Sequence, residues 1–500
     1  MSNTFKRRFK WRTSYKIVFI FWMVWILLLI SFNLLAQRPS IVFTKEGQKF
    51  GSVISEQTKL QLIACRDMLN YPKTVERFYS TRAYRLAWVE MDQHSSQIAQ
   101  AMMILDCVAQ FGLNRSDFHP EALIYKQIEV LSEEPGMLSS GERAIFDVLL
   151  TDAMITFMNH LHYGKFNTIL TRSKIDEGAG DMKAEISLSG LMGVKDFYNE
   201  IGNVQPVSEE YDELQRYMHL VRGQYLEDSY EFPEQSVRKM TINMERLRWL
   251  STVQTPNVVI NIPAFTAKVK LKNITQKYKV VVGKPSSPTP ILESSITHFT
   301  VAPEWKVPHK IFINEILPKA IKRVDYLDDN HYTIYDAKGK YTEPTSQKLH
   351  FILKHPQNYF ARQSSGCDNA LGKIVFRFPN TYDVYLHDTP QPELFLLPKR
   401  GISHGCIRIE QVEKLAALLL LQDGSASKIP VMRKSILSYQ TKTFIFKTAV
   451  PVKLVYLTCE MIDGQLVIYH DIYAQDFGLE LAMYGSEKLL ASDLRIRQKF

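Results

Sequence analysis

The chain has 500 residues, 45% of them hydrophobic and 23% charged, with a formal net charge of +9. The length exceeds that of one ordinary domain, and the composition is typical of a globular protein with buried cores. Six of the 61 basic residues lie within the first sixteen positions, and the other basic residues nearly balance the 52 acidic ones. A folded nucleic-acid-binding surface needs a basic stripe, so we expect no nucleic acid partner.

The N-terminal segment joins these charges to a long apolar run. Residues 17–36 are almost uninterruptedly apolar, which is enough for a helix to span roughly 30 Å of bilayer hydrocarbon. Basic residues stay cytoplasmic, so residues 1–16 are predicted to be a cytoplasmic tail and residues 17–36 a single transmembrane anchor. A cleaved signal peptide is the competing interpretation, but the apolar run would be unusually long and Leu34 stands where a small residue is expected. Residues 37–55 are predicted to be a polar linker.

Residues 56–242 have a mainly helical pattern and are predicted to form a helical domain. The clearest element begins at Ser139 and Glu142, which have the spacing of a capping box. Its apolar residues cover nearly all sides of the helix as far as Gly164, so we expect a helix buried at the centre of the domain. A second helix is predicted over about residues 207–226.

The pattern changes near residue 255 from helical periodicity to short β-branched and aromatic runs bounded by Gly, Pro and Asn. These runs predict strands at residues 258–262, 277–282 and 375–378. Residues 303–365 are rich in Pro, Asp, Asn and Tyr and look like an insertion over the face of a sheet. A helix is expected over residues 410–421, and a β-rich portion over residues 452–473 precedes a charged tail. The predicted fold class is therefore α+β.

The chain contains an odd number of cysteines: Cys65, Cys107, Cys367, Cys406 and Cys459. Outside the cytoplasm, an odd number leaves at least one thiol unpaired or paired with another molecule. No two of them have the spacing of a zinc site, so we expect no metal and no cofactor. The disulfide state of the four cysteines other than Cys406 stays open.

One histidine and one cysteine have the context of a catalytic pair. The predicted strand of residues 382–387 ends at His387, and Cys406 follows nineteen residues later in a turn that we expect to lead directly into a helix. An adjacent imidazole and a helix N-terminus both lower the pKa of a thiol and so favour the nucleophilic thiolate. Gly405 allows a tight turn whose N–H groups can face an oxyanion, and Arg408 can bind a carboxylate.

Most cysteines in apolar surroundings are buried small side chains, and Cys367 is a useful comparison for Cys406. Cys367 also follows Ser and Gly, but no apolar helix begins behind it and no arginine follows two residues later. We interpret Cys367 as a loop residue and Cys406 as the nucleophile.

These residues resemble the active-site motif of the YkuD-type L,D-transpeptidases, with His-Asp-Thr at 387–389 followed by Ser-His-Gly-Cys-Ile-Arg at 403–408. The order of His before Cys separates this family from papain-like peptidases. The motifs Ala-Leu-Gly-Lys at 370–373 and Asn-Met-Glu-Arg-Leu-Arg-Trp at 243–249 are similar to those of the large Gram-negative branch, which has a helical scaffold domain. The resemblance covers roughly residues 60 to 475. The chain between 227 and 242 is too short for the small wall-binding module that many members of this branch carry.

The resemblance implies a mostly β catalytic domain at residues 243–440, with residues 303–365 as a substrate-capping insertion and residues 441–500 as a C-terminal β-rich extension and tail. It implies that Cys406 is the nucleophile and His387 the general base. The residues implied to line the substrate and oxyanion pocket are Tyr385, Ser403, His404, Gly405 and Arg408.

The implied reaction is peptidoglycan L,D-transpeptidation, in which stem peptides are joined 3→3 through a cysteine thioester and D-Ala is released. The implied partners are a donor tetrapeptide and an acceptor stem, and a cell-wall synthase partner is left open. The implied location is the inner membrane, with the catalytic portion in the periplasm. Two alternatives stay open: an L,D-carboxypeptidase or endopeptidase that hydrolyses stems, and a non-enzymatic, membrane-tethered wall-binding protein.

Overall fold

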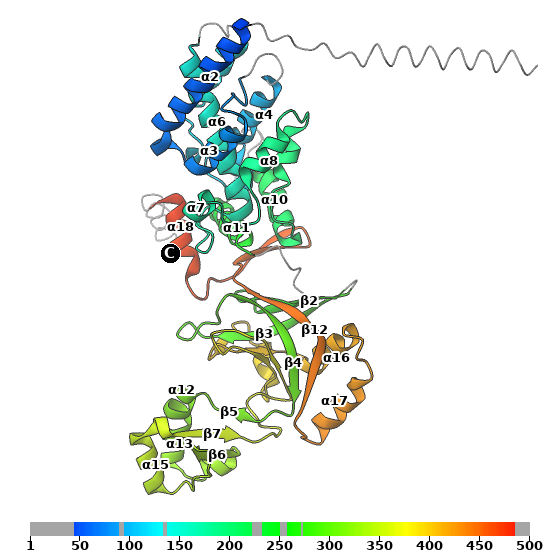
Figure 1. Ribbon diagram of the computed structural model, residues 1–500. Coiled ribbons are helices and arrows are strands. Elements are labelled where there is room, and N and C mark those ends of the chain that lie inside the picture. Colours follow the sequence, from blue (N-terminus) through cyan, green and yellow to red (C-terminus); the bar gives the residue numbers. More distant parts are fainter. Residues whose placement is uncertain are drawn as a thin grey trace, which may run out of the picture.

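The computed structural model describes residues 45–89, 95–133, 138–222, 233–250, 258–271 and 274–485 (Figure 1). The predicted cytoplasmic tail and transmembrane anchor lie outside these residues. Within them, one helix is long and apolar enough to cross a membrane, α6 (Ser140–Tyr163), and 94% of its most apolar window is buried inside the protein. The expectation of a buried central helix is therefore confirmed.

The first part of the described chain is helical, as predicted. Its helices, including short 3-10 turns, are α2 (Lys45–Ala64), η1 (Arg66–Met68), α3 (Pro72–Thr81), α4 (Ser95–Asp106), η2 (Val108–Phe111), η3 (Arg115–Asp117), α5 (Tyr125–Glu133), α6, α7 (Arg172–Asp176), α8 (Ala184–Leu191), α9 (Phe197–Gly202), α10 (Glu209–Arg222) and α11 (Glu234–Arg248). Helix α2 packs against α6 and buries Thr58. Residues 45–55, which the sequence analysis assigned to a polar linker, are helical and belong to α2.

Helix α6 begins with the predicted capping box. The Glu142 N–H donates to the Ser139 hydroxyl at 3.2 Å, and the Ser139 N–H donates to the Glu142 carboxylate at 2.8 Å. The buried carboxylates of α6 are also satisfied, since Asp147 accepts the N–H groups of Trp88 and Val89. Polar groups that would be costly in a core thus join the preceding loops to the central helix.

The second part of the chain is built on a nine-stranded sheet with the order β10-β3-β11-β9-β8-β4-β12-β1-β2. Its strands are β1 (Val258–Asn261), β2 (Thr266–Leu271), β3 (Ile274–Gly283), β4 (Leu292–Val301), β8 (Ile374–Arg377), β9 (Leu386–His387), β10 (Gly401–Ser403), β11 (Ile407–Ile409) and β12 (Lys442–Val455). The strands predicted at 258–262, 277–282 and 375–378 are present as β1, β3 and β8. Strand β12 lies between β4 and β1, so the domain boundary predicted at residue 440 cuts this sheet.

Two helices, α16 (Val412–Gln422) and α17 (Lys428–Leu437), bury their apolar residues in the core of this sheet. The helix predicted from residue 410 begins two residues later. The reason is that Glu410 still belongs to the edge of β11: its N–H donates to the carbonyl of Lys279 on β3 at 3.0 Å. Gln411 then has a φ of +52° and turns the chain into α16.

The insertion predicted at residues 303–365 forms a small separate layer with its own apolar core (Figure 1). It contains the sheet β5-β7-β6 and short helices: β5 (Trp305–Lys306), α12 (His309–Ile311), the π-turn η5 (Phe312–Ile316), α13 (Leu317–Lys322), α14 (Tyr326–Asp329), β6 (Tyr332–Asp336), α15 (Ser346–Lys354), η6 (Pro356–Asn358) and β7 (Tyr359–Gln363). It lies at the end of the large sheet away from the helical part.

The chain after β12 returns to the helical part as the hairpin β13 (Cys459–Ile462) and β14 (Gln465–Ile468), followed by α18 (Gln475–Tyr484) (Figure 1). Helix α11 packs against β13 and α18. Asn243 accepts the Thr458 N–H at 2.8 Å, and Arg246 donates to Asp476 at 2.5 Å. The boundary predicted between residues 242 and 243 therefore falls inside a helix that belongs to both parts.

Candidate active site

Adjacent parallel strands bring the predicted nucleophile and base together. In the ladder of β9 and β11, Leu386 lies opposite Ile407 and His387 lies opposite Arg408. Leu386 and Ile407 are fully buried in the core of the large sheet. Because strand side chains alternate, His387 and Arg408 project from the other face, and Cys406, directly before β11, belongs to that face too. His387 and Cys406, which are nineteen positions apart in the sequence, therefore belong to one site.

Cys406 lies in a strand-to-strand turn and not at a helix entrance, so that part of the sequence interpretation is wrong. Residues 404–406 connect β10 to β11, and helix α16 begins only at Val412. The physical reason is that Ile407–Ile409 alternates apolar and polar residues and pairs with strands on both sides. The field of a helix N-terminus therefore does not act on the thiol at close range.

Two hydrogen bonds of Ser403 hold this turn. Its hydroxyl accepts the Gly405 N–H at 3.1 Å and donates to the Cys406 carbonyl at 2.6 Å. Gly405 has a φ of +118°, a conformation that favours glycine. Ser403 is 3% exposed, so it shapes the turn from inside and does not form a pocket wall.

The connection between β3 and β4 braces the same turn, which the sequence interpretation missed. The Thr289 hydroxyl accepts the Gly283 N–H at 2.8 Å and donates to the Gly405 carbonyl at 2.7 Å. The Ser287 hydroxyl donates to the His404 carbonyl at 2.9 Å. In the sequence, the only signal was a proline-rich stretch, which indicates a rigid connection but not what it touches.

The strand predicted over residues 382–387 is shorter than expected. The Asn380 side chain accepts the N–H groups of Tyr382 and Val384 at 3.0 and 3.1 Å and donates to the Val384 carbonyl at 2.8 Å. Asp383 has a φ of +54°. This local turn competes with the ladder, so only Leu386–His387 pairs as a strand. The turn also places the Asp383 carbonyl 3.9 Å from the Cys406 Sγ.

Burial sets the protonation states of the pair. Burial raises the pKa of the Cys406 thiol, against the opposing influence of Tyr385, Arg377 and Arg408. Burial, followed by the positive charge of Arg408, lowers the pKa of His387 to about 3. The expectation of a depressed thiol pKa is therefore wrong for the free protein, because desolvation exceeds the favourable charges. Near neutral pH the resting thiol of Cys406 and the resting imidazole of His387 are therefore both neutral.

Two polar atoms at the site are buried without a partner. Within the described part of the chain, neither Nδ1 of His387 nor Nε of Arg408 has a hydrogen-bond partner. Buried polar atoms are normally satisfied, so unpaired atoms at a catalytic face are groups that a substrate or water can satisfy.

The insertion touches the site at two predicted pocket residues. His404 Nε2 lies 2.6 Å from the Glu315 carboxylate of η5, and both side chains are partly exposed. Tyr385 packs against the core of the insertion, which includes Trp305, and its ring centroid lies 5.5 Å from that of His387. Tyr385 therefore connects the insertion to His387, the predicted base.

An arginine that the sequence analysis did not single out, Arg377, also lies on the face that carries His387 and Arg408. Arg377 on β8 has its guanidinium carbon 5.1 Å from the ring centroid of Tyr385. It lies one residue beyond Phe376, which is paired with Leu386 of β9. The strand pattern around it predicted β8 but carried no sign of which strand would lie beside it.

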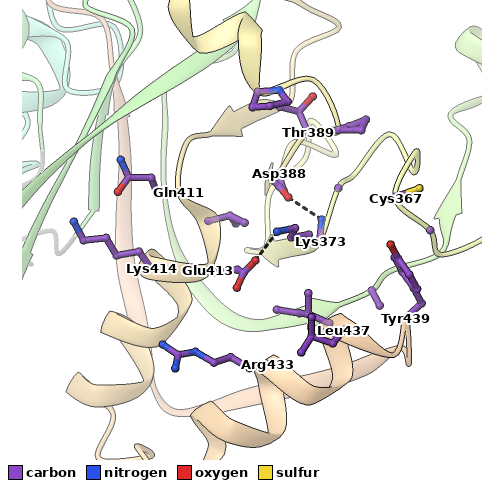
Figure 2. A pocket seen from close by; sticks show the side chains of 17 residues that line it. Cys367, Lys373, Asp388, Thr389, Gln411, Glu413, Lys414, Arg433, Leu437 and Tyr439 are labelled. Carbon is purple, nitrogen blue, oxygen red and sulfur yellow. Dashed lines mark hydrogen bonds and ion pairs between the residues drawn. The ribbon is translucent and has the colours of Figure 1, made fainter.

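A separate cavity of about 880 Å³ lies beyond the end of β9, and neither Cys406 nor His387 lines it (Figure 2). Lys373 is bound to Asp388 and Glu413 there, while Cys367 lies in the connection from β7 to β8 and is exposed. Cys367 is thus a loop residue away from the base, as expected. All five cysteines are free thiols, and the described residues contain no group of three or more His, Cys, Asp or Glu side chains that could hold a metal.

Comparison with known proteins agrees with this geometry. Residues 255–433 match the family model of the YkuD L,D-transpeptidase catalytic domain, and residues 73–218 match that of the Scaffold domain. A Haemophilus influenzae protein named "Putative L,D-transpeptidase" is 24% identical over 440 residues, which cover 83% of this chain and 80% of the relative. The chain, with a helical scaffold preceding a YkuD catalytic domain, therefore belongs to the L,D-transpeptidase family.

Proposed function

We propose that this protein is a peptidoglycan L,D-transpeptidase that forms 3→3 cross-links through a thioester on Cys406 and releases D-Ala. The observation that carries the proposal is the placement of Cys406 and His387 on one face of adjacent parallel strands, with Arg408 opposite His387. A family member with this pair has both a nucleophile and a base to activate it.

The first half of the proposed reaction forms the thioester. His387 takes the thiol proton as Cys406 Sγ attacks the carbonyl at the L-centre of the third residue of the donor stem. The carbon–nitrogen bond to D-Ala breaks, and the imidazolium returns the proton to the departing amine. The pKa of His387 of about 3 keeps the imidazole neutral near pH 7, and the same shift makes it a weaker base than an ordinary histidine.

The second half transfers the donor to an acceptor. The side-chain amine of a neighbouring stem attacks the thioester carbonyl and gives up a proton to His387. The carbon–sulfur bond then breaks, and Cys406 leaves as a thiolate that recovers that proton. Atoms and charge balance in both steps without a metal or cofactor. The energy of the cross-link comes from the cleaved D-Ala bond.

We assign the remaining predicted residues as follows. The Gly405 N–H is already bound to Ser403, so the oxyanion donors proposed here are the Cys406 N–H and the Tyr385 hydroxyl. Burial raises the pKa of Tyr385 well above its ordinary value, which keeps that hydroxyl protonated as a donor. Arg408 is proposed to bind a donor carboxylate, because its buried Nε lacks a partner within the described chain.

The insertion is proposed to cap the substrate. Two contacts with the site support this role: His404 contacts Glu315 of the insertion, and Tyr385 packs against the core of the insertion. The acceptor stem would then enter between the insertion and the sheet. We further propose that residues 17–36 anchor the protein in the inner membrane, with the catalytic part in the periplasm near cell-wall synthases.

The proposal is tested by incubating the full-length protein with tetrapeptide muropeptides and analysing the products by mass spectrometry. We expect free D-Ala and 3→3 dimers from the wild type and from Cys367→Ala, and neither from Cys406→Ala or His387→Asn. Dimers made by Cys406→Ala would overturn the nucleophile assignment. Release of D-Ala without dimers would favour the carboxypeptidase, and binding to sacculi without either product would favour a non-enzymatic wall-binding protein.

A further inference from the structure

The register of the large sheet aligns three side chains on one row. Phe376 of β8 pairs with Leu386 of β9, and Leu386 pairs with Ile407 of β11. One residue away in each ladder, Arg377 lies beside Tyr385, and Tyr385 lies beside Cys406. The Ile407 N–H donates to the Tyr385 carbonyl at 3.1 Å, which confirms the second neighbour. Since cross-strand neighbours project from the same face, all three belong to the catalytic face.

This row places a second guanidinium close to the nucleophile. Adjacent strands are roughly 4.8 Å apart, so the backbones of Arg377 and Cys406 are separated by about 10 Å, which the long arginine side chain partly spans. The Arg377 guanidinium lies over the Tyr385 ring in a cation–π contact, and its positive charge opposes the rise in the pKa of Cys406. Arg408, two residues along β11, is the other cation near the thiol.

The Arg377 guanidinium is exposed and uncompensated. Among the described residues, no carboxylate lies within ion-pair distance of it, whereas Arg362 on β7, which also stacks on aromatic rings, has Glu304 at 3.8 Å. A guanidinium presents paired donors that match the two oxygens of a carboxylate. Stacking on Tyr385 restricts its position, which lowers the entropy lost when it binds an anion.

We propose that Arg377 is a specificity-determining residue that binds a carboxylate which the donor stem keeps after D-Ala has left. The inference rests on the proposed function and names the chemical group that the donor must carry. A stem bound at Cys406 has two such carboxylates: the free α-carboxylate of the second residue and the side-chain carboxylate of the diamino acid. Each lies roughly six or seven bonds from the attacked carbonyl, and an extended chain of that length spans about 7 Å. Either carboxylate can therefore reach the guanidinium of Arg377, whose long side chain covers the rest of the distance.

The test compares three tetrapeptide stems in D-Ala release by the full-length protein. One stem has both carboxylates free, one is amidated at the second residue, and one is amidated on the diamino acid side chain. We expect the wild type to disfavour an amidated stem by about tenfold in kcat/KM. The amide whose penalty disappears in Arg377→Gln identifies the carboxylate that Arg377 binds, whereas a penalty that persists in this variant belongs to Arg408. Arg377→Gln should lose about tenfold on the free stem, mainly through KM, and should treat that stem and its amide alike. Arg377→Lys should keep part of the preference, because it retains the charge but not the paired donors.

Arg433→Gln is the matched control, since Arg433 is an exposed arginine of the separate cavity in Figure 2 and its removal also deletes one positive charge. It should keep the wild-type preference. The inference is overturned if the wild type uses all three stems equally, or if Arg377→Gln lowers activity on all three by the same factor, which a structural role at Tyr385 would produce. Absence of D-Ala release by the wild type from every stem would instead contradict the proposed function. Arg377→Lys keeps the test informative if the Gln variant unfolds.

Discussion

Arg408 lies directly opposite His387 in the parallel ladder of β11 and β9, so a permanent cation faces the proposed general base. Together with burial, this charge lowers the pKa of His387 to about 3. The base is therefore deprotonated across the whole physiological range, and the reaction needs no prior loss of a proton from the imidazole. The thiol must still lose its proton, which is less favourable because burial raises the pKa of Cys406.

Substituting Arg408 should move the acid limit of acylation. Removing the cation in Arg408→Gln raises the pKa of His387, so the base is lost at a higher pH. We expect the pH below which the acylation rate falls to increase by about one unit, equivalent to about 1.4 kcal/mol of charge interaction. The measurement is the rate of acylation by a carbapenem, followed by intact mass from pH 3 to 8. Arg408→Lys should leave this pH unchanged, because it keeps the positive charge. A shift to lower pH in Arg408→Gln would contradict the conclusion that Arg408 lowers the pKa of His387.

An alkylating reagent and a carbapenem should modify different cysteines. Cys367 is exposed, whereas the pKa of Cys406 is raised by burial. A small neutral alkylating reagent at pH 7.5 should therefore modify Cys367 first, because thiolate content and access govern alkylation. A carbapenem, which needs the catalytic pair, should modify only Cys406. Peptide mapping after each treatment checks both outcomes, and carbapenem on Cys367 would be incompatible with this site.

The buried Thr289 should be more important to the active-site turn than Ser287, which is partly exposed. Thr289→Val keeps the shape but leaves the Gly283 N–H and the Gly405 carbonyl without their partner. We expect a loss of about 2 kcal/mol in the free energy of unfolding and about tenfold slower acylation of Cys406. Ser287→Ala should cost less than about 1 kcal/mol. Urea denaturation and acylation kinetics measure both, and equal effects of the two variants would argue against a role for the buried bridge.

The junction between the helical part and the sheet should depend on Asp476. Its carboxylate accepts Arg246 at 2.5 Å, Thr458 at 2.8 Å and Lys239. Asp476→Asn leaves the buried Arg246 charge uncompensated, so we expect about 3 kcal/mol of destabilisation. Glu177→Gln, which breaks the exposed pair with Lys73, is the control and should cost less than about 0.5 kcal/mol. Thermal unfolding by calorimetry would show whether the two parts then melt separately.

His160 should make the protein less stable in mild acid. Burial, with the charges of Lys165, Arg248 and Arg172, lowers its pKa to about 3, while an unfolded histidine titrates near 6.5. Between these values the unfolded chain binds a proton that the folded one does not, so stability falls as pH decreases from about 6.5. The loss between pH 7 and pH 5 should be about 2 kcal/mol for this residue.

His160→Phe should remove about 2 kcal/mol of that dependence, because the group that titrates in the unfolded chain is gone, while the similar contribution of His387 remains. His350→Gln, at an exposed position of α15, should not change it. Urea denaturation at pH 5 and pH 7 gives the comparison, and an unchanged slope in His160→Phe would place the acid sensitivity elsewhere.

Local patterns of the sequence were sufficient for several elements. The capping box at Ser139 and Glu142 satisfies its own backbone groups, so it forms wherever the helix is placed. The all-round apolar pattern of α6 likewise indicated burial without any knowledge of its neighbours. The order of His387 and Cys406, with the residues around each, was specific enough to indicate the family.

The sequence by itself determined which residues are the candidates for the chemistry; the tertiary structure decided how they are arranged. Pairing with β3 and β9 made residues 407–409 a strand, which removed the helix expected directly after Cys406. Burial then reversed the expected direction of the thiol pKa, and the sheet register brought Arg377 into the row of Tyr385. Strand pairing and desolvation depend on segments far apart in the chain, so no local pattern near Cys406 contains them.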